Sequence, residues 1–277
     1  MSTLVDGLAV GRRPRAFVGV TGPDAGDYLN RMVSNDVLAL APGASCEALL
    51  LTPKSRVIAP LRVLRRGEDD FLLLTEVELG ETVRDYLARM RFAARAQIEL
   101  EEHESHVLLG AGASAPQGAL AVRNDDYGLP GVEVLDAPAV AGAAPLDGET
   151  LEQLRIRAGT PRFGREIDEG VLPAEAGLVE RAVSLTKGCY PGQEPVARLH
   201  HRGHVNRRLR VLWIEATEPP APGVELVHAG RPVGRVTSAV AAPGGILALG
   251  YIRTEVPEDA VLVVEGAAAT MAPPERP

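Results

Sequence analysis

One cysteine of this chain lies where its thiol could be exposed. Cys189 stands in the stretch LTKGCYPGQEPVARL, residues 185–199, with Gly188 before it and Gly192 shortly after it. Glycines allow positive φ angles and the close approach of another molecule. Lys187 lies two residues earlier, where its charge could stabilise the thiolate, the form that attacks electrophiles and binds metals. These residue types favour a functional thiol, although a single cysteine is more commonly a small buried hydrophobic residue.

A helix is expected directly after this cysteine. The sequence GQEPVARL can start one, with Pro195 in its first turn, and the positive end of the helix dipole would favour the thiolate further. The only other cysteine, Cys46, lies in the apolar run CEALLL and is expected in the core. Two cysteines in a chain of 277 residues predict reduced thiols rather than a disulfide.

The second chemical signal is a basic stretch, RLHHRGHVNRRLR, residues 198–210, which contains no acid. Guanidinium groups bind carboxylate or phosphate through paired hydrogen bonds, so the stretch predicts an anion site in a protein of net charge −8. A solvated surface at the seam between two domains is the alternative. Its five arginines are Arg198, Arg202, Arg207, Arg208 and Arg210.

A metal site is not expected. His200 and His204 are four residues apart and could join Cys189 around an ion. Gly203 lies between them, and neither a second cysteine nor a nearby carboxylate completes the set.

A dinucleotide site is not expected either. Gly110, Gly112 and Ala115 have the spacing of a dinucleotide fingerprint, and Asp136 lies where a ribose-binding acid would be. Pro116 and the glycines beyond it prevent the helix that such a site requires, so we predict a turn between strands.

Composition places the chain among globular proteins. It is 45% hydrophobic and 24% charged, without an apolar run long enough for a membrane helix. The N-terminal residues lack an export signal, which predicts a cytoplasmic protein. The negative net charge and an aromatic content of 4% argue against nucleic acid as the main ligand.

The pattern of elements predicts an α+β fold. AFVGVTG reads as a strand, followed by an amphipathic helix that Asp24 can cap. A second helix is expected around residues 83–90 and a third from Gly148 to Gly159. Short strands beyond Arg207 predict a small β-barrel. We expect one region over residues 1–205, with two intertwined subdomains that cross near 95–148, and a barrel over 206–277.

The octapeptide KGCYPGQE resembles the signature of YgfZ-type proteins, relatives of the glycine-cleavage T-protein, an aminomethyltransferase, and matches its seven specified positions. TGPDAGDYLNRMVSNDVLAL, LRIRAGTPRFGREIDEGVLPAEAGL and VARLHHRGHVNRRL are similar to further segments of that superfamily. The resemblance implies three domains around a central folate-binding channel: two mixed α/β domains with largely antiparallel sheets, and a C-terminal barrel.

The chain departs from the T-protein pattern at three positions. Arg157 stands where the relatives commonly have a glutamate that holds the pterin. In TPKSRVIAPLRV, Ser55 replaces a glycine and Pro60 replaces an aspartate that would polarise a folate nitrogen. These departures weaken the case for aminomethyl transfer.

The resemblance instead implies a tetrahydrofolate-dependent protein that supports assembly or repair of iron–sulfur clusters and is linked to tRNA modification. Its partners would be folate and cluster-related proteins. Cys189 would be the functional thiol, tuned by Lys187, and would engage a one-carbon, sulfur or cluster intermediate. A folate-dependent aminomethyltransferase and a non-catalytic adaptor linked to folate or tRNA are the alternatives. The cofactor-binding residues implied are Glu175, Gln193, Glu194, Arg198, Arg202 and Arg207.

Overall fold

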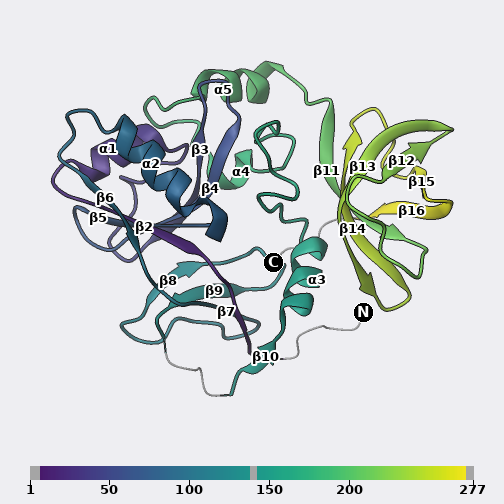
Figure 1. Cartoon of the computed structure of the whole chain (residues 1–277), viewed down its shortest axis with the longest axis horizontal. Coiled ribbons are helices and arrows are strands. Elements are labelled where there is room, and N and C mark those ends of the chain that lie inside the picture. The colour runs from purple at the N-terminus through teal and green to yellow at the C-terminus, as the bar shows by residue number, and fades with distance from the viewer. Residues whose placement is uncertain (1–6, 138–141, 273–277) are drawn as a thin grey trace.

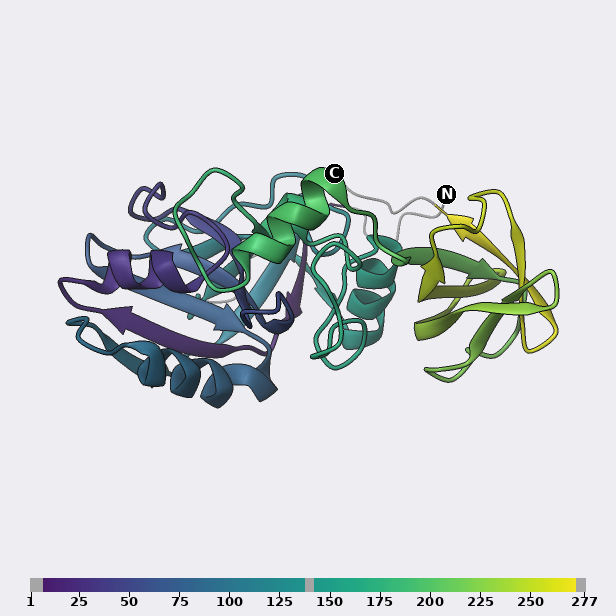
Figure 2. The ribbon, with the colours of Figure 1, turned by 90° about the horizontal axis from the view of Figure 1, so that it is seen from above.

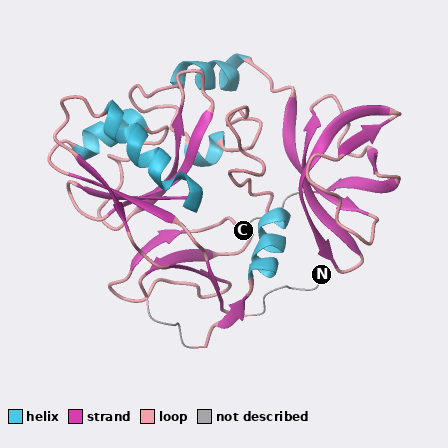
Figure 3. Cartoon of the chain, viewed as in Figure 1, coloured by secondary structure: helices cyan, strands magenta, loops and turns pink. Residues whose placement is uncertain are grey.

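The computed structural model describes residues 7–137 and 142–272, except the side chain of Arg202. Two five-stranded sheets and a closed six-stranded barrel make up the molecule (Figure 1). Strands dominate, and the helices are few and short (Figure 3). The α+β architecture with two sheets and a C-terminal barrel is as predicted.

The first sheet is antiparallel throughout and carries helices on one face. Helices α1 (Ala25–Met32) and α2 (Gly80–Met90) share one core cluster with it, and a 3₁₀ turn, η1 (Val77–Leu79), leads into α2. The opposite face packs against the second sheet, which explains why the run FLLLT is buried on both sides. Its strands in spatial order are β3 (Ser45–Leu51), β4 (Val57–Arg65), β5 (Asp70–Thr75), β2 (Ala16–Thr21) and β6 (Gln97–Glu101).

The second sheet is antiparallel except for its outermost pair, β10 and β1. Helix α3 (Gly148–Arg157) follows it and links it to the barrel. Leu151 and Leu154 of α3 join the core of the sheet, and Ile156 packs on barrel residues. The strands in spatial order are β10 (Ala144–Leu146), β1 (Ala9–Arg12), β7 (Ser105–Leu109), β9 (Gly131–Leu135) and β8 (Leu120–Arg123).

The barrel closes on itself and encloses its own apolar core. Figure 2 shows α3 and the loops after it between the first sheet and the barrel. Two further helices, α4 (Val179–Ala182) and α5 (Gln193–Arg202), lie in the segment that leads to the barrel. The barrel strands in spatial order are β11 (Arg207–Ile214), β14 (Gly245–Arg253), β13 (Arg231–Ala242), β12 (Glu225–His228), β15 (Val261–Val264) and β16 (Ala267–Ala272).

Two local predictions have clear outcomes. Asp24 is at the N-cap of α1, but its carboxylate makes no capping bond and instead accepts hydrogen bonds from the backbone and side chain of Arg95. The capping prediction was therefore wrong. The segment after β7 forms a turn between strands, as predicted, because Gly110 has φ 110° and a Cβ there would lie 2.0 Å from the Gly7 carbonyl oxygen.

No helix in the described ranges combines the length and the apolar character needed to cross a membrane.

Candidate functional site

The loop before α5 carries Cys189 and is fixed to the first sheet at its start. The Ser184 amide donates to the Ser34 carbonyl at 3.0 Å. The buried Ser34 hydroxyl donates to the Ala182 carbonyl at 2.6 Å and accepts from the Leu49 amide of β3 at 2.7 Å. The chain therefore enters the cysteine loop from a fixed position.

Lys187 anchors the middle of the loop. Its ammonium donates to three backbone carbonyls, those of Asn30 in α1 and, at 2.8 Å each, Val33 and Asn35 just beyond it. Burial lowers the pKa of Lys187 to about 8, and the group carries three N–H donors while it is charged. The ammonium also lies 5.3 Å from the centre of the Tyr190 ring. Its hydrogen bonds lead to the end of α1, and none of them reaches the Cys189 thiol.

The end of the loop is held by a close backbone contact. Gly192 has φ 84°, and a Cβ at this position would lie 2.7 Å from the Thr52 carbonyl oxygen. The buried Ser55 hydroxyl donates to the Gly192 carbonyl at 2.6 Å. Ser55 itself has φ 59°, a left-handed conformation that glycine adopts more readily than serine.

Between these anchors the thiol of Cys189 is free and exposed. Tyr190 next to it is buried. Gln193, the first residue of α5, reaches back to the Lys187 carbonyl at 3.4 Å, and Glu194 is exposed. The geometry presents an accessible thiol on an anchored loop, which suits nucleophilic attack or binding to a soft metal.

The other thiol is different. Cys46 in β3 is free and partly buried, and it packs against the core of the first sheet, as predicted. Burial raises the pKa of the Cys46 thiol to about 12, so it stays protonated and unreactive at neutral pH.

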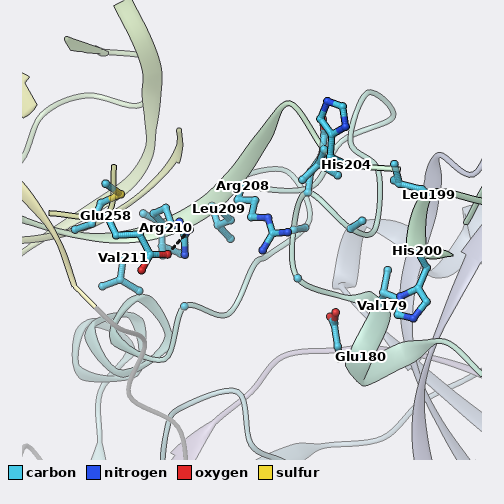
Figure 4. A pocket seen from close by; sticks show the side chains of 18 of the residues that line it. Val179, Glu180, Leu199, His200, His204, Arg208, Leu209, Arg210, Val211 and Glu258 are labelled. Carbon is cyan, nitrogen blue, oxygen red and sulfur yellow. Dashed lines mark hydrogen bonds and ion pairs between the residues drawn. The ribbon is translucent and has the colours of Figure 1, made fainter. Parts of the chain in front are cut away.

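A cleft of about 600 Å³ lies between the segment 174–180, the C-terminal end of α5, and the barrel. The side chains of Arg208 and Glu180 point into it (Figure 4). Arg210 on its rim is paired with Glu258 at 2.8 Å. The remaining walls combine basic and apolar groups, namely His200, His204, Leu199, Val205, Leu209, Val211, Leu249 and Met271.

The predicted cofactor residues do not all meet in this cleft. Glu175 lines it and is paired with Arg207 at 3.2 Å, but Arg207 itself lies on the other side, stacked on Tyr251. Arg198 is exposed on α5. The side chain of Arg202 lies outside the described residues. Gln193 and Glu194 form the start of α5 next to the cysteine loop, at the opposite end of the helix from the cleft residue His200.

The centre of the molecule is nearly filled. A cavity of only about 60 Å³ remains between the two sheets and α3, with Pro60 in its wall. The charged side chains around it form ion pairs, such as Arg62 with Asp126 at 2.8 Å and Arg13 with Glu76 at 2.6 Å. The cavity is therefore narrow and lined by ion-paired side chains at the place where the resemblance implies a folate channel.

The positions of possible metal ligands can be compared with the expectation that no metal site forms. In the part of the chain that the structure describes, one group of three ligand atoms lies within 4.8 Å of one another, from Glu47, Asp125 and Asp126. Arg181 is bound to all three of these carboxylates, so an arginine takes the place of a cation. The group includes none of Cys189, His200 and His204.

Sequence reasoning missed several contacts that position the candidate site. Nothing in the sequence pointed to Ser34, or to the α1 carbonyls that hold Lys187. Glu180 had no recognisable spacing to any basic residue. Ser55 departs from the glycine of the family pattern, and that departure was a possible signal of its left-handed conformation.

Comparisons with known proteins fit this geometry. No protein-family model matches the sequence. The tRNA-modifying protein YgfZ of Edwardsiella ictaluri is 28% identical over 285 residues, covering 89% of this chain and 85% of that protein. The mitochondrial iron-sulfur cluster assembly factor IBA57 homolog of Neurospora crassa is 24% identical over 238 residues, covering 75% of this chain and 54% of that protein.

A solved structure establishes the fold. The glycine cleavage system aminomethyltransferase T of Bartonella henselae matches with a TM-score of 0.84 at 19% identity, over 97% of this chain and 86% of that one. In sequence the chain is similar to YgfZ proteins, including the KGCYPGQE loop, and in fold it is similar to the aminomethyltransferase.

Proposed function

We propose that this protein binds a tetrahydrofolate-type ligand and supports the assembly or repair of iron–sulfur clusters, with Cys189 as its functional thiol. The observation that carries the proposal is the exposed Cys189 on a loop anchored by Lys187 and Gly192. The names of two relatives, an iron-sulfur cluster assembly factor and a tRNA-modifying protein, support it.

The thiol suits iron chemistry. A cysteine thiolate is the ordinary ligand of cluster iron, and an exposed one can reach a cluster held by another protein. In the proposed encounter the thiol gives its proton to water, and the thiolate sulfur donates an electron pair to an iron of the cargo cluster, while one ligand of the carrier protein leaves that iron and takes up a proton. No electron is transferred in this step. The partners are therefore cluster-carrying or cluster-assembling proteins.

The cleft beside α5 fits a folate in volume and in donor set. Glu180 and Glu175 offer carboxylates to the N–H donors of a pterin, the apolar wall suits a benzoyl ring, and Arg208 with His200 suits glutamate carboxylates. When bound, a tetrahydrofolate supplies ring nitrogens that carry one-carbon units. The residues of this chain bind and orient the ligand.

Aminomethyl transfer is less well supported. Pro60 replaces the acid that would polarise the folate, and it borders a cavity of about 60 Å³. A proline cannot hold or move a proton, so the reaction would lack its acid at this position.

Calorimetry with tetrahydrofolate tests the ligand half of the proposal. We expect the wild type to bind, Arg208→Ala to bind about tenfold or more weakly because a charged hydrogen bond contributes about 1.5–3 kcal/mol, and Cys189→Ala to bind like the wild type. Arg231→Ala, an exposed arginine outside the cleft, is the control. If the wild type does not bind tetrahydrofolate, the proposed cleft is contradicted. It is also contradicted if Cys189→Ala loses binding while Arg208→Ala binds like the wild type.

A further inference from the structure

A second large cavity lies on the far side of Arg207 from the α5 cleft. It occupies about 690 Å³ between the segment 164–171 and the outer face of the barrel. Four arginines line it, and they come from separate parts of the chain: Arg165, Arg207, Arg235 and Arg253. We call this cavity the arginine groove.

The barrel register explains how three of these arginines meet. Arg207 of β11 lies directly opposite Arg253 of β14, and Arg235 of β13 lies opposite Tyr251 of β14. Ile252 belongs to the barrel core, so Tyr251 and Arg253 on either side of it face outward. Like charges directly opposite each other on neighbouring strands are destabilising. The barrel thus concentrates positive charge at one point of its outer surface.

The acids around the groove engage these arginines only in part. The carboxylate of Glu166 is already bound by Arg155 and by the Ser238 hydroxyl, and it is buried. Glu175 pairs with Arg207 through one guanidinium nitrogen only. Arg253 reaches Glu255 at 3.5 Å with both side chains mostly exposed, a weak pair.

Arg165 and Arg235 are exposed at the groove. Glu225 of β12 lies directly opposite Arg235, and a further acid of the groove, Asp168, also accepts from the Gly170 amide at 2.7 Å. An anion placed between the four guanidinium groups would relieve their mutual repulsion.

The number of guanidinium groups indicates the class of anion. A carboxylate is planar and has two oxygens, so two guanidinium forks satisfy it. A phosphate group offers three oxygens and up to two negative charges, and can accept from three or more guanidiniums at once. We infer that the arginine groove binds a phosphorylated small molecule, separately from the cysteine loop and the α5 cleft.

Calorimetry with pyrophosphate tests this inference at low ionic strength. We expect the wild type to bind, and Arg235→Gln and Arg253→Gln each to weaken binding about tenfold, the effect of losing one charged hydrogen bond. Arg165→Gln probes the opposite wall and should weaken binding as well. Arg231→Gln, at the exposed start of β13, is the matched control and should bind like the wild type.

Citrate provides the second arm, because it carries similar charge on carboxylates. We expect citrate to bind at least tenfold more weakly than pyrophosphate. Equal binding of citrate with the same dependence on Arg235 and Arg253 contradicts the phosphate class. Pyrophosphate binding that none of the groove variants weakens overturns the site itself. Neither result depends on tetrahydrofolate binding, so the inference and the proposed function fail separately.

Discussion

Lys187 holds the cysteine loop in place. The sequence suggested that its charge stabilises the Cys189 thiolate, but its three hydrogen bonds lead to carbonyls at the end of α1. A single ammonium thus ties the loop to the C-terminal end of a helix, where positive charge is favourable. We therefore treat Lys187 as a positioning residue, and its effect on Cys189 as one of placement.

Replacing Lys187 by Met should release the loop. Removing the ammonium leaves three part-buried carbonyls without their donor, at a cost of about 1–3 kcal/mol for a lost buried partner. Hydrogen exchange of residues 184–192 should become faster than in the wild type. The exposed Lys54→Met is the control, because Lys54 lies in the neighbouring turn. Unchanged exchange together with a shifted pKa of the Cys189 thiol would show that Lys187 tunes the thiol instead.

The two glycines around Cys189 should respond differently to alanine. Gly192 has φ 84° and no room for a Cβ, whereas a Cβ on Gly188 would meet nothing within 4 Å. Gly192→Ala should lower the free energy of unfolding by about 1–3 kcal/mol through strain, and Gly188→Ala should change it little. Chemical denaturation measures both, and equal effects would be inconsistent with the anchored end of the loop.

Among single residues, the sequence identified the exposed cysteine but not the contacts that anchor its loop. Cys189 lies in the KGCYPGQE motif and is exposed as predicted. Cys46 lies in an apolar run and packs against the core of the first sheet, also as predicted. The contacts of Lys187 and Ser55 cross more than 130 residues of sequence. No local pattern encodes such contacts.

At the scale of elements, the spacing of apolar residues was sufficient to predict the positions of most helices and the presence of the barrel. The helices predicted near 83–90, from Gly148 and after Gly192 all form, because apolar spacing and glycine or proline signals are local. The Asp24 cap failed because a distant partner, Arg95, competes for the carboxylate. A capping prediction made from local sequence fails when a distant residue forms a stronger hydrogen bond with the capping side chain.

A hydrogen-bonded histidine joins the ends of three strands, and its titration predicts that the free energy of unfolding depends on pH. His103, between β6 and β7, hydrogen-bonds to Asp136 after β9 at 2.6 Å and to Glu101 of β6 at 3.0 Å. Burial opposes the charge, but the two carboxylates outweigh it and raise the pKa of His103 above its usual value. The stabilisation is fully present below about pH 6.5, the unfolded value, and is lost as the pH rises through the raised folded value.

We expect the free energy of unfolding to fall over that interval in the wild type. His103→Gln should remove this component, because glutamine does not titrate. Denaturation curves at several pH values test it. A wild-type curve with the same slope as His103→Gln would rule out the contribution of His103.

At the scale of the whole molecule, a buried ion-pair network joins the first sheet to the second. Arg15 binds Glu133 at 2.9 Å, although 118 residues separate them, and both are buried. Burial would raise the pKa of Glu133, but Arg15 lowers it to about 2. Sequence analysis predicted the two sheets but not this network, because its members share no spacing.

Breaking one partner of this pair should be costly. Glu133→Gln leaves the buried Arg15 charge with only the more distant carboxylates of Glu76 at 3.6 Å and Asp126 at 3.8 Å, and we expect a loss of about 3 kcal/mol in the free energy of unfolding. The double variant Arg15→Met, Glu133→Leu should be less destabilised than Glu133→Gln. Asp24→Asn, which breaks an exposed pair, is the control and should change stability little. A Glu133→Gln protein as stable as the wild type would mean that the network contributes nothing to the packing of the sheets.

The resemblance implied a folate channel in the centre, and the structure shows a narrow cavity lined by charged residues there. Charged pairs leave about 60 Å³ there, while clefts of about 600 and 690 Å³ open on either side of the segment that leads to the barrel. In the sequence, the replacement of one channel acid by Pro60 was the signal that this region differs from the T-protein pattern. The filling of the centre comes from residues spread over the whole chain.

The central claim is that the anchored Cys189 thiol supports iron–sulfur enzymes. Its most direct measurement is the activity of a cluster-dependent enzyme in cells that lack this protein and express the wild type, Cys189→Ser or the control Cys46→Ser. We predict that the wild type and Cys46→Ser restore the activity and that Cys189→Ser, expressed at the same level, does not. Full restoration by Cys189→Ser would contradict the claim.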